Sequence, residues 1–364
     1  MTTRQRAVQG RLLDNRHRVG GEIPAARCLL SGPNAAGEWP LLRLSNGLRL
    51  ILAARPGTPT VAVRAYVRAG SRYDAEHCLP GSGQPGLGLA HLTEHLLFKG
   101  TRTRSQRQLF TAIERLGGTL EAGTAKEYLC VSTVVPPAGL ALALEIVAEI
   151  LGQPSLDAED FGNEKLVILA EKLRAQDREA RILDLFAEAL WQEHPLSHPA
   201  PGTLAGLQAV DPDSLLAFYR QRFVGGNIVL VLCGAFEPQA AESLAVGYFG
   251  TLPAGPEQPP APFCEPPPAA PRATHLERDL HQASLLLGVP TVSMGHPDRS
   301  ALKVIERDAA EFEESVVTAR HHAASAHAPS GCPASSVRVI PLVETRQRPA
   351  VVAAPGPGGR PGLQ

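Results

Sequence analysis

The sequence predicts an α+β fold, in which a mainly antiparallel sheet is flanked by helices and a partial second domain follows. Three features lead to this prediction. Runs of alternating apolar residues near the start and the middle of the chain indicate strands, and longer amphipathic runs between and after them indicate helices. The third feature is the segment 252–271, in which nine of twenty residues are proline, because such a segment is typical of an interdomain linker.

The first strands are expected between residues 39 and 70. Leucines alternate on both sides of Asn46-Gly47, which predicts a hairpin with a type I′ turn. Residues 60–70 alternate again and predict another strand. Residues 77–89 are rich in glycine and proline and predict a loop.

The middle of the chain is expected to form helices around further strands. Gly117-Gly118 should end one helix, Pro154 should end the next, and a long helical run should be interrupted near Asp177. The expected helices cover 89–101, 105–118, 140–154, 158–191 and 211–223. Two strands are expected within 119–135 and a buried strand at 227–236.

The chain is expected to divide into five parts. Beyond the linker, 275–292 has the pattern of a strand and 296–312 that of a helix. The parts are a loosely ordered N-terminal extension (1–37), a first domain (38–251), the Pro-rich linker (252–271), a partial second domain (272–318) and a low-complexity tail that is expected to be disordered (319–364).

Composition and charge argue against several classes of protein. The 35 basic and 36 acidic residues give a net charge of −1, which argues against a nucleic-acid binder. No apolar run is long enough to span a membrane, and the N-terminus lacks the apolar stretch of a secretory signal. The six cysteines are scattered without a C-x-x-C pair, so neither a disulfide framework nor a thiolate zinc site is expected. We therefore expect a protein of the reducing cytoplasm.

One motif carries chemistry, namely His91, Glu94 and His95 in a run that is expected to be helical. Side chains four residues apart lie one above the other on a helix, about 6 Å apart, so two imidazoles can share one cation. The spacing H-x-x-E-H is the inverzincin motif. Catalytic zinc needs a third protein ligand and an open position for water, and a carboxylate beside that water can accept and later deliver a proton.

The alternative is a chance occurrence on a surface helix, because the chain has 12 histidines. The neighbouring residues argue against it. Leu92, Leu96 and Leu97 make this helix apolar, and unpaired polar groups on such a helix would be costly unless a metal compensated them.

Beyond the motif, the chain resembles the pitrilysin/insulinase family of zinc metallopeptidases, which includes the mitochondrial processing peptidases. The stretch GLAHLTEHLLFKGT is similar to the active-site helix of that family, and RLSNGLRLIL is similar to its opening hairpin. The resemblance covers roughly residues 38–305 and continues through the segments AGSRYD, IERLGGTLEAGT, FGNEKLVILAEKLR and HPLSHPAPGT.

The resemblance implies a set of metal ligands. The third zinc ligand of the family corresponds to Glu171, 76 positions after His95, so one zinc ion per chain is expected on His91, His95 and Glu171. Glu94 would be the general base. Glu164, seven residues before Glu171, would orient a histidine or the water. The alternative is that Glu164 and Glu171 are solvated charges on an exposed helix.

The resemblance also implies that a peptide binds as an added strand along the edge at Leu120–Thr124. The family usually has Asn-Ala where this chain has Glu121-Ala122. Backbone pairing does not depend on that side chain, but a negative charge beside the scissile bond can alter substrate choice. The alternative is that Glu121 simply points to solvent.

We therefore expect a zinc-dependent metalloendopeptidase that hydrolyses extended peptides, with its metallopeptidase domain at 38–251. The full unit of the family has two related halves, whereas the second half becomes unrecognisable here near Ile305. The expected partner besides the peptide is a separate second-half subunit or a second copy of the chain. Two alternatives stay open, a non-catalytic peptide-binding or scaffolding subunit that pairs with another family member, and a truncated inactive fragment.

Overall fold

The computed structural model describes residues 39, 41–77, 87–175, 180–261, 263, 270, 272–276, 286, 288–293 and 295–311. Within them, six strands form one sheet in the order β1-β2-β6-β3-β5-β4. The strands are β1 (Leu41–Arg43), β2 (Arg49–Ala54), β3 (Val61–Val67), β4 (Thr119–Thr124), β5 (Leu129–Val135) and β6 (Ile228–Gly234). Strands β2 and β6 run parallel and every other pair is antiparallel, so the mainly antiparallel sheet is confirmed.

The last of these strands along the sequence lies in the middle of the sheet. Strand β6 pairs with β2 on one side and with β3 on the other. Its residues Ile228, Leu230 and Leu232 are fully buried, as the continuous apolar run predicted. Strand β4 lies at the far edge of the sheet, next to β5.

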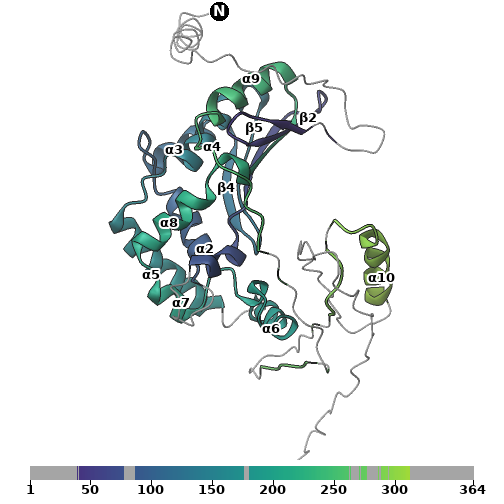
Figure 1. The fold of residues 1–364 in the computed structure, drawn as a ribbon. Helices are drawn as coiled ribbons and strands as arrows, with labels where there is room; N and C mark the ends of the chain where they lie inside the picture. Colours follow the sequence, from purple (N-terminus) through teal and green to yellow (C-terminus); the bar gives the residue numbers. More distant parts are fainter. Residues whose placement is uncertain are drawn as a thin grey trace, which may run out of the picture.

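Helices cover one face of the sheet. Figure 1 shows α2, α4, α5 and α8 on one side of the strands. The alternation within β3 agrees, because Val61, Val63 and Ala65 are buried whereas Arg64 is exposed. The helices are α2 (Leu89–Leu97), α3 (Gln106–Glu114), α4 (Leu140–Gly152), α5 (Ala158–Ala175), α6 (Ala180–Leu190), α7 (Leu204–Ala209), α8 (Pro212–Arg222), α9 (Pro238–Phe249) and α10 (Arg299–Glu311), with a 3₁₀ segment η2 (Ser71–His77) before α2.

Most of the expected elements are present, with three differences among the helices, of which the first is that α9 was not expected. The run predicted for 158–191 is divided into α5 and α6, and the interruption expected near Asp177 lies outside the described residues. Helix α7 was not expected. It begins after Thr203, whose side chain accepts a hydrogen bond from the backbone N–H of Gly206.

The type I′ turn predicted at Asn46-Gly47 is wrong. That turn requires positive φ at both central residues, and here Gly47 has φ 95° whereas Asn46 does not have a positive φ. Strands β1 and β2 are instead joined by a longer turn that the bond from Leu44 N to Leu48 O closes. The reason is a long-range contact, since the Asn46 side chain donates to Phe249 O at 2.8 Å and accepts from Leu48 N at 3.2 Å.

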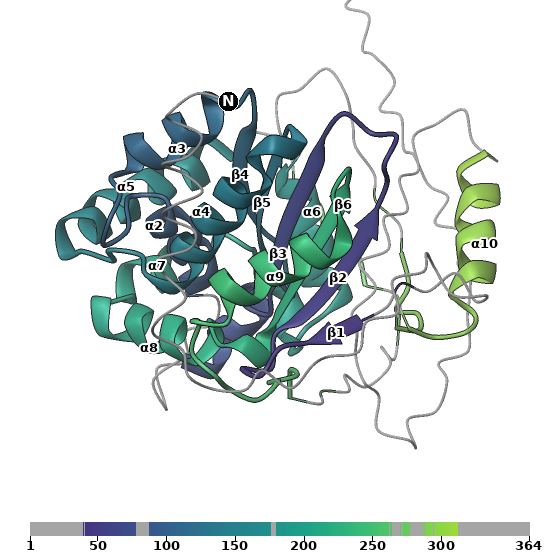
Figure 2. The ribbon, with the colours of Figure 1, turned by 90° about the horizontal axis from the view of Figure 1, so that it is seen from above.

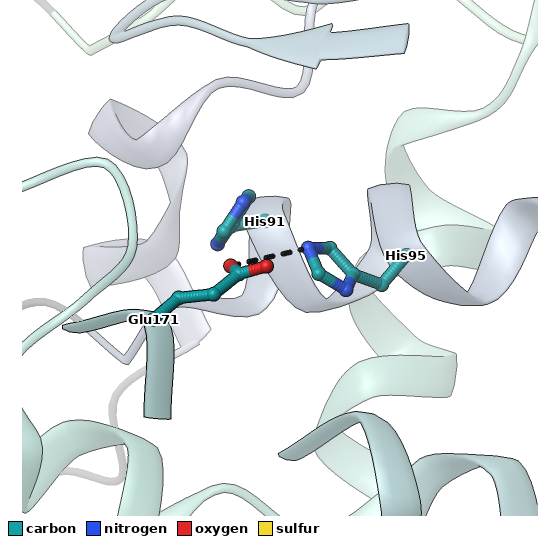
Figure 3. Close-up of side chains that lie close together, drawn as sticks. All are labelled: His91, His95 and Glu171. Atoms are coloured by element: carbon teal, nitrogen blue, oxygen red, sulfur yellow. Dashed lines mark ion pairs between the residues drawn. The ribbon is translucent and has the colours of Figure 1, made fainter. Parts of the chain in front are cut away.

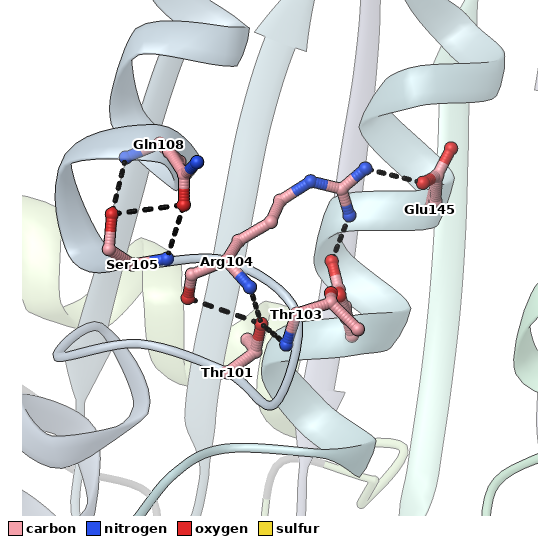
Figure 4. Close-up of polar contacts among 7 residues, drawn as sticks. Thr101, Thr103, Arg104, Ser105, Gln108 and Glu145 are labelled. Atoms are coloured by element: carbon pink, nitrogen blue, oxygen red, sulfur yellow. Dashed lines mark hydrogen bonds and ion pairs between the residues drawn. The ribbon is translucent and has the colours of Figure 1, made fainter.

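The connection from α2 to α3 is fixed by side chains (Figure 4). Thr101 Oγ1 accepts from the backbone N–H of Arg104 at 3.0 Å. The Arg104 guanidinium reaches Glu145 on α4 at 2.5 Å and also pairs with Glu149 on the same helix. Ser105 and Gln108 then form a capping box at the start of α3. These contacts hold α3 at a fixed distance from α2.

The beginning of the Pro-rich segment is not a free connection. Its described residues 252–261 form no helix or strand, as expected, but they are bound to the first domain. Gly225 N donates to Pro253 O at 2.9 Å, and Gly226 N donates to Gly255 O at 3.1 Å. The Glu257 carboxylate bridges Arg49 at 3.1 Å and Arg68 at 2.7 Å. This part of the expected linker therefore packs as part of the first domain.

The remaining expectations concern the ends of the chain. Among the described residues of 275–292 no strand is present, whereas the helix expected at 296–312 is present as α10. Helix α10 lies apart from the sheet in both views (Figures 1 and 2). The expected extension 1–37 and tail 319–364 lie outside the described residues, so the domain boundaries stay a prediction. No described helix has the length and apolar character that crossing a membrane requires.

A carboxylate from outside α2 caps its N-terminus. Gly88 precedes the helix with φ 77°, and a Cβ there would approach Pro201 O to 2.8 Å, so no capping side chain fits at this position. Asp74 from η2 takes that role, because its two carboxylate oxygens accept from Gly88 N at 2.7 Å and Ala90 N at 3.0 Å. Asp74 is fully buried. This contact fixes the first turn of the helix that carries His91.

We expect Asp74→Ala to lower the free energy of unfolding by at least about 2 kcal/mol, because it leaves buried N–H donors without acceptors. The matched control is Asp211→Ala, which removes an exposed cap on α8 and should cost about 1 kcal/mol. Urea unfolding followed by circular dichroism measures both. Equal losses in the two variants would contradict a special role for the buried cap.

Candidate metal centre

The motif His91, Glu94 and His95 lies on α2, as predicted. The helix buries Leu89, Leu92 and Leu96 against the core. The opposite, less buried side carries both histidines, whose ring centroids are 4.6 Å apart with the rings nearly perpendicular (Figure 3). The spacing of four residues has therefore brought the two imidazoles to one side of the helix.

Glu171 comes from α5 and completes a group of three side chains. One potential ligand atom from each of His91, His95 and Glu171 lies within 4.8 Å of the other two. His95 Nε2 lies 3.7 Å from Glu171 Oε2 (Figure 3). The structure thus brings together the three residues that the sequence suggested as ligands, although their role as ligands stays a prediction.

Burial keeps the imidazole of His91 neutral. Burial, with a smaller effect of His95, lowers the pKa of His91 to about 4. Its Nδ1 atom is buried and has no hydrogen-bond partner among the described residues. A neutral imidazole with an unpaired nitrogen is the form that binds a metal ion.

Glu164 orients His95. Its side chain is buried on α5, where Oε2 lies 2.9 Å from His95 Nδ1 and Oε1 lies 2.5 Å from Lys99 Nζ. Burial by itself would raise the pKa of Glu164, but the hydrogen bonds from Lys99 and His95 outweigh it and lower the pKa. An ionised Glu164 can accept a hydrogen bond only if His95 Nδ1 is the donor, and the other ring nitrogen, Nε2, faces Glu171.

Glu94 connects α2 to the edge strand. The hydroxyl of Thr124, at the end of β4, donates to Glu94 Oε2 at 2.5 Å. Burial raises the pKa of Glu94, whereas the Thr124 hydrogen bond and the charge of His95 lower it. This hydrogen bond therefore links the helix that carries the histidines to the end of the edge strand.

A cavity of about 210 Å³ opens beside these residues. Its lining includes Glu121 and Ala122, the two residues that the sequence suggested for the peptide-binding edge of the sheet. Phe98 and Phe110 pack against each other in its wall with centroids 5.7 Å apart. The lining residues are Glu94, His95, Phe98, Lys99, Gln106, Phe110, Leu120, Glu121, Ala122 and Glu164.

Three residues at this site were not found from the sequence. Lys99 lies four residues after His95, so helical spacing alone could have placed it on the same side of α2. Thr124 and Asp74 reach α2 from other elements, and no local pattern indicates those contacts.

Two family models match the chain. The model described as Insulinase (Peptidase family M16) matches residues 49–203, and the model described as Peptidase M16 inactive domain matches residues 209–307. The chain therefore belongs to the insulinase family, peptidase family M16, which confirms the resemblance seen in the sequence.

Two relatives of this chain are named for different roles. An uncharacterized zinc protease of Mycobacterium tuberculosis is 31% identical over 265 residues, which cover 72% of this chain and 59% of the relative. The mitochondrial core protein I of the ubiquinol-cytochrome-c reductase complex of Euglena gracilis is 29% identical over 269 residues, covering 72% of this chain and 51% of that protein. The chain thus spans less than two thirds of the length of these relatives.

A solved structure has a similar fold. The crystal structure of a protease from Helicobacter pylori matches with a TM-score of 0.63 at 20% identity, over 74% of this chain and 64% of that one. Such a likeness shows the fold alone, and it agrees with the α+β fold that the sequence predicted.

We expect Glu164→Gln to weaken zinc binding by about 10–100-fold, because a neutral amide orients His95 less strongly than a carboxylate does. The control is Glu159→Gln, the same change at an exposed position on the same helix. Competition with a fluorescent zinc chelator measures both affinities. Equal affinities would remove Glu164 from this supporting role.

Proposed function

We propose that this chain is a zinc-dependent metalloendopeptidase that hydrolyses peptides in extended conformation. The observation that carries the proposal is the approach of His91, His95 and Glu171 to within 4.8 Å of one another, with Glu94 beside them. Membership of the insulinase family and a relative named as a zinc protease support it.

The side chains fit a zinc ion. Two imidazoles and one carboxylate are a ligand set that catalytic zinc takes in proteins. Nδ1 of His91 is buried without a hydrogen-bond partner among the described residues, and Nε2 of His95 faces Glu171. Zinc held by these three residues would supply Lewis acidity, which polarises a carbonyl group and favours ionisation of water.

Glu94 is the proposed general base. Thr124 donates to one of its carboxylate oxygens and so fixes the orientation of the group. Glu94 would take a proton from the attacking water and give it to the nitrogen of the leaving amine, which releases the new N-terminus. Glu94 is not one of the three proposed metal ligands, and Thr124 holds its carboxylate in place. Its role as a general base can therefore be tested separately from metal binding.

Strand β4 is the proposed binding site for the peptide backbone. Within the described residues it pairs on one side only, with β5, so its outer peptide groups can pair with an added strand. Glu121 and Ala122 lie on this strand and line the cavity that also contains Glu94. A peptide paired there would present its backbone next to the proposed catalytic residues.

The second candidate is a non-catalytic subunit that binds or scaffolds other chains. The observation that favours it is the likeness to a relative named as a core protein of a respiratory complex. The presence of His91, Glu94, His95 and Glu171 favours the peptidase instead. In either case we propose that a separate second-half subunit or a second copy of the chain is the partner.

We expect one zinc ion per chain, and His91→Ala and Glu171→Gln should each lower its occupancy sharply, because losing a ligand removes much of the binding free energy. Metal analysis after dialysis against a weak chelator measures the occupancy, with Glu159→Gln as the control. Full zinc in both ligand variants would contradict the assignment.

We expect Glu94→Gln to retain zinc and the fold but to lower peptide turnover by about 10²–10⁴-fold, because proton transfer is lost. Metal analysis and cleavage of a quenched fluorescent peptide library test the two parts. Near-normal turnover would remove Glu94 as the base, and loss of zinc would make it a ligand instead.

A further inference from the structure

The two faces of β4 differ in charge. Leu120 is buried, and Thr124 reaches Glu94, so the even-numbered residues face α2. Alternation turns Glu121 and Gly123 to the opposite face, and both residues are exposed. A peptide added along this edge would therefore place every second side chain beside Glu121 or Gly123, on the face away from the helices.

Glu121 carries a charge that no described residue neutralises by an ion pair. Its partner across the strand pair is Ser132, and Ser132 is in turn opposite Arg64 on β3. Arg64 thus lies two strands away, and its guanidinium is hydrogen-bonded to Tyr66 OH at 3.5 Å. Glu164, on the helical side of the sheet, is different, because it is paired with Lys99.

The structure leaves space for a long side chain next to this carboxylate. Gly123 follows Glu121 on the same face, and a Cβ at Gly123 would meet no atom within 4 Å. A lysine or arginine of an added strand can therefore lie along β4 over Gly123 without displacing a described side chain. An exposed carboxylate with open space beside it is a site for a cation on a neighbouring strand.

We propose that Glu121 selects peptides with lysine or arginine at the position opposite it on the added strand. This inference rests on the proposed function, because it takes β4 as the peptide-binding edge. Directly opposed side chains on paired antiparallel strands have Cβ atoms about 4.5–5.5 Å apart, so opposite charges attract and like charges repel. The preferred substrate class is thus an extended peptide with a basic residue close to the bond that Glu94 faces.

The test uses peptides in which one arginine is moved along an otherwise uncharged sequence, with glutamine and glutamate series as references. Binding is measured by fluorescence anisotropy on zinc-loaded Glu94→Gln protein, with and without Glu121→Gln, so that no cleavage occurs. We expect the peptide with arginine at one particular position to bind about 2–5-fold more tightly than the peptide with glutamine at the same position. Glu121→Gln should abolish this preference, Glu121→Lys should transfer it to glutamate, and Glu159→Gln should leave it unchanged.

The role of Glu121 and the proposed peptidase function can each be contradicted without the other. An arginine preference that persists in Glu121→Gln, or no preference at any register, would overturn the role of Glu121. The same peptides are then offered to the wild-type chain, and cleavage is followed by mass spectrometry. Binding with a Glu121-dependent preference but without cleavage would support the role of Glu121 and contradict the peptidase.

Discussion

The candidate metal centre depends on one buried carboxylate between two helices. Glu164 of α5 lies between His95 on α2 and Lys99, which follows the end of α2. Because Glu164 is buried, its charge is tolerated only while both partners are in place. The same contact sets the rotation of α5 about its own axis, so that Glu171, two turns further along, reaches the histidines. Orientation of the imidazoles and approach of the third side chain therefore have a common cause.

Sheet topology decides what lies beside this centre. Strand β6 lies between β2 and β3 in the middle of the sheet, and β4, which pairs with β5 alone among the described strands, has an open side. Thr124 then joins the end of that strand to Glu94 by a single hydrogen bond. An edge strand is normally a liability for a soluble protein, because its unpaired peptide groups attract other chains. Here the open edge lies next to the side chains that we propose for catalysis, so the same exposure would serve the proposed binding of a peptide.

Local sequence patterns predicted most helices and strands. Long-range contacts determine the turn at Gly47 and the docking of residues 252–261. Leucine alternation and the four-residue histidine spacing were sufficient for the strands and for α2, since both depend on neighbouring residues. The turn at Gly47 was predicted wrongly, because the Asn46 side chain is bound to Phe249 O about two hundred residues away. The docking of residues 252–261 depends on Glu257 meeting Arg49 and Arg68, which no local pattern indicates. The grouping of Glu171 with the histidines was available only through the family resemblance.

Metal binding and peptide turnover have different structural requirements in this chain. The three proposed ligands and Glu94 come from α2 and α5, which both lie within residues 49–203, where the insulinase model matches. Nothing in this group of side chains requires residues beyond the first domain. Turnover requires more, because orientation of the substrate can account for several kcal/mol of the barrier, and an open site leaves the reacting groups exposed to bulk water. A second half, supplied by a partner subunit or another copy, would therefore act on turnover and leave the metal affinity of the first domain largely unchanged.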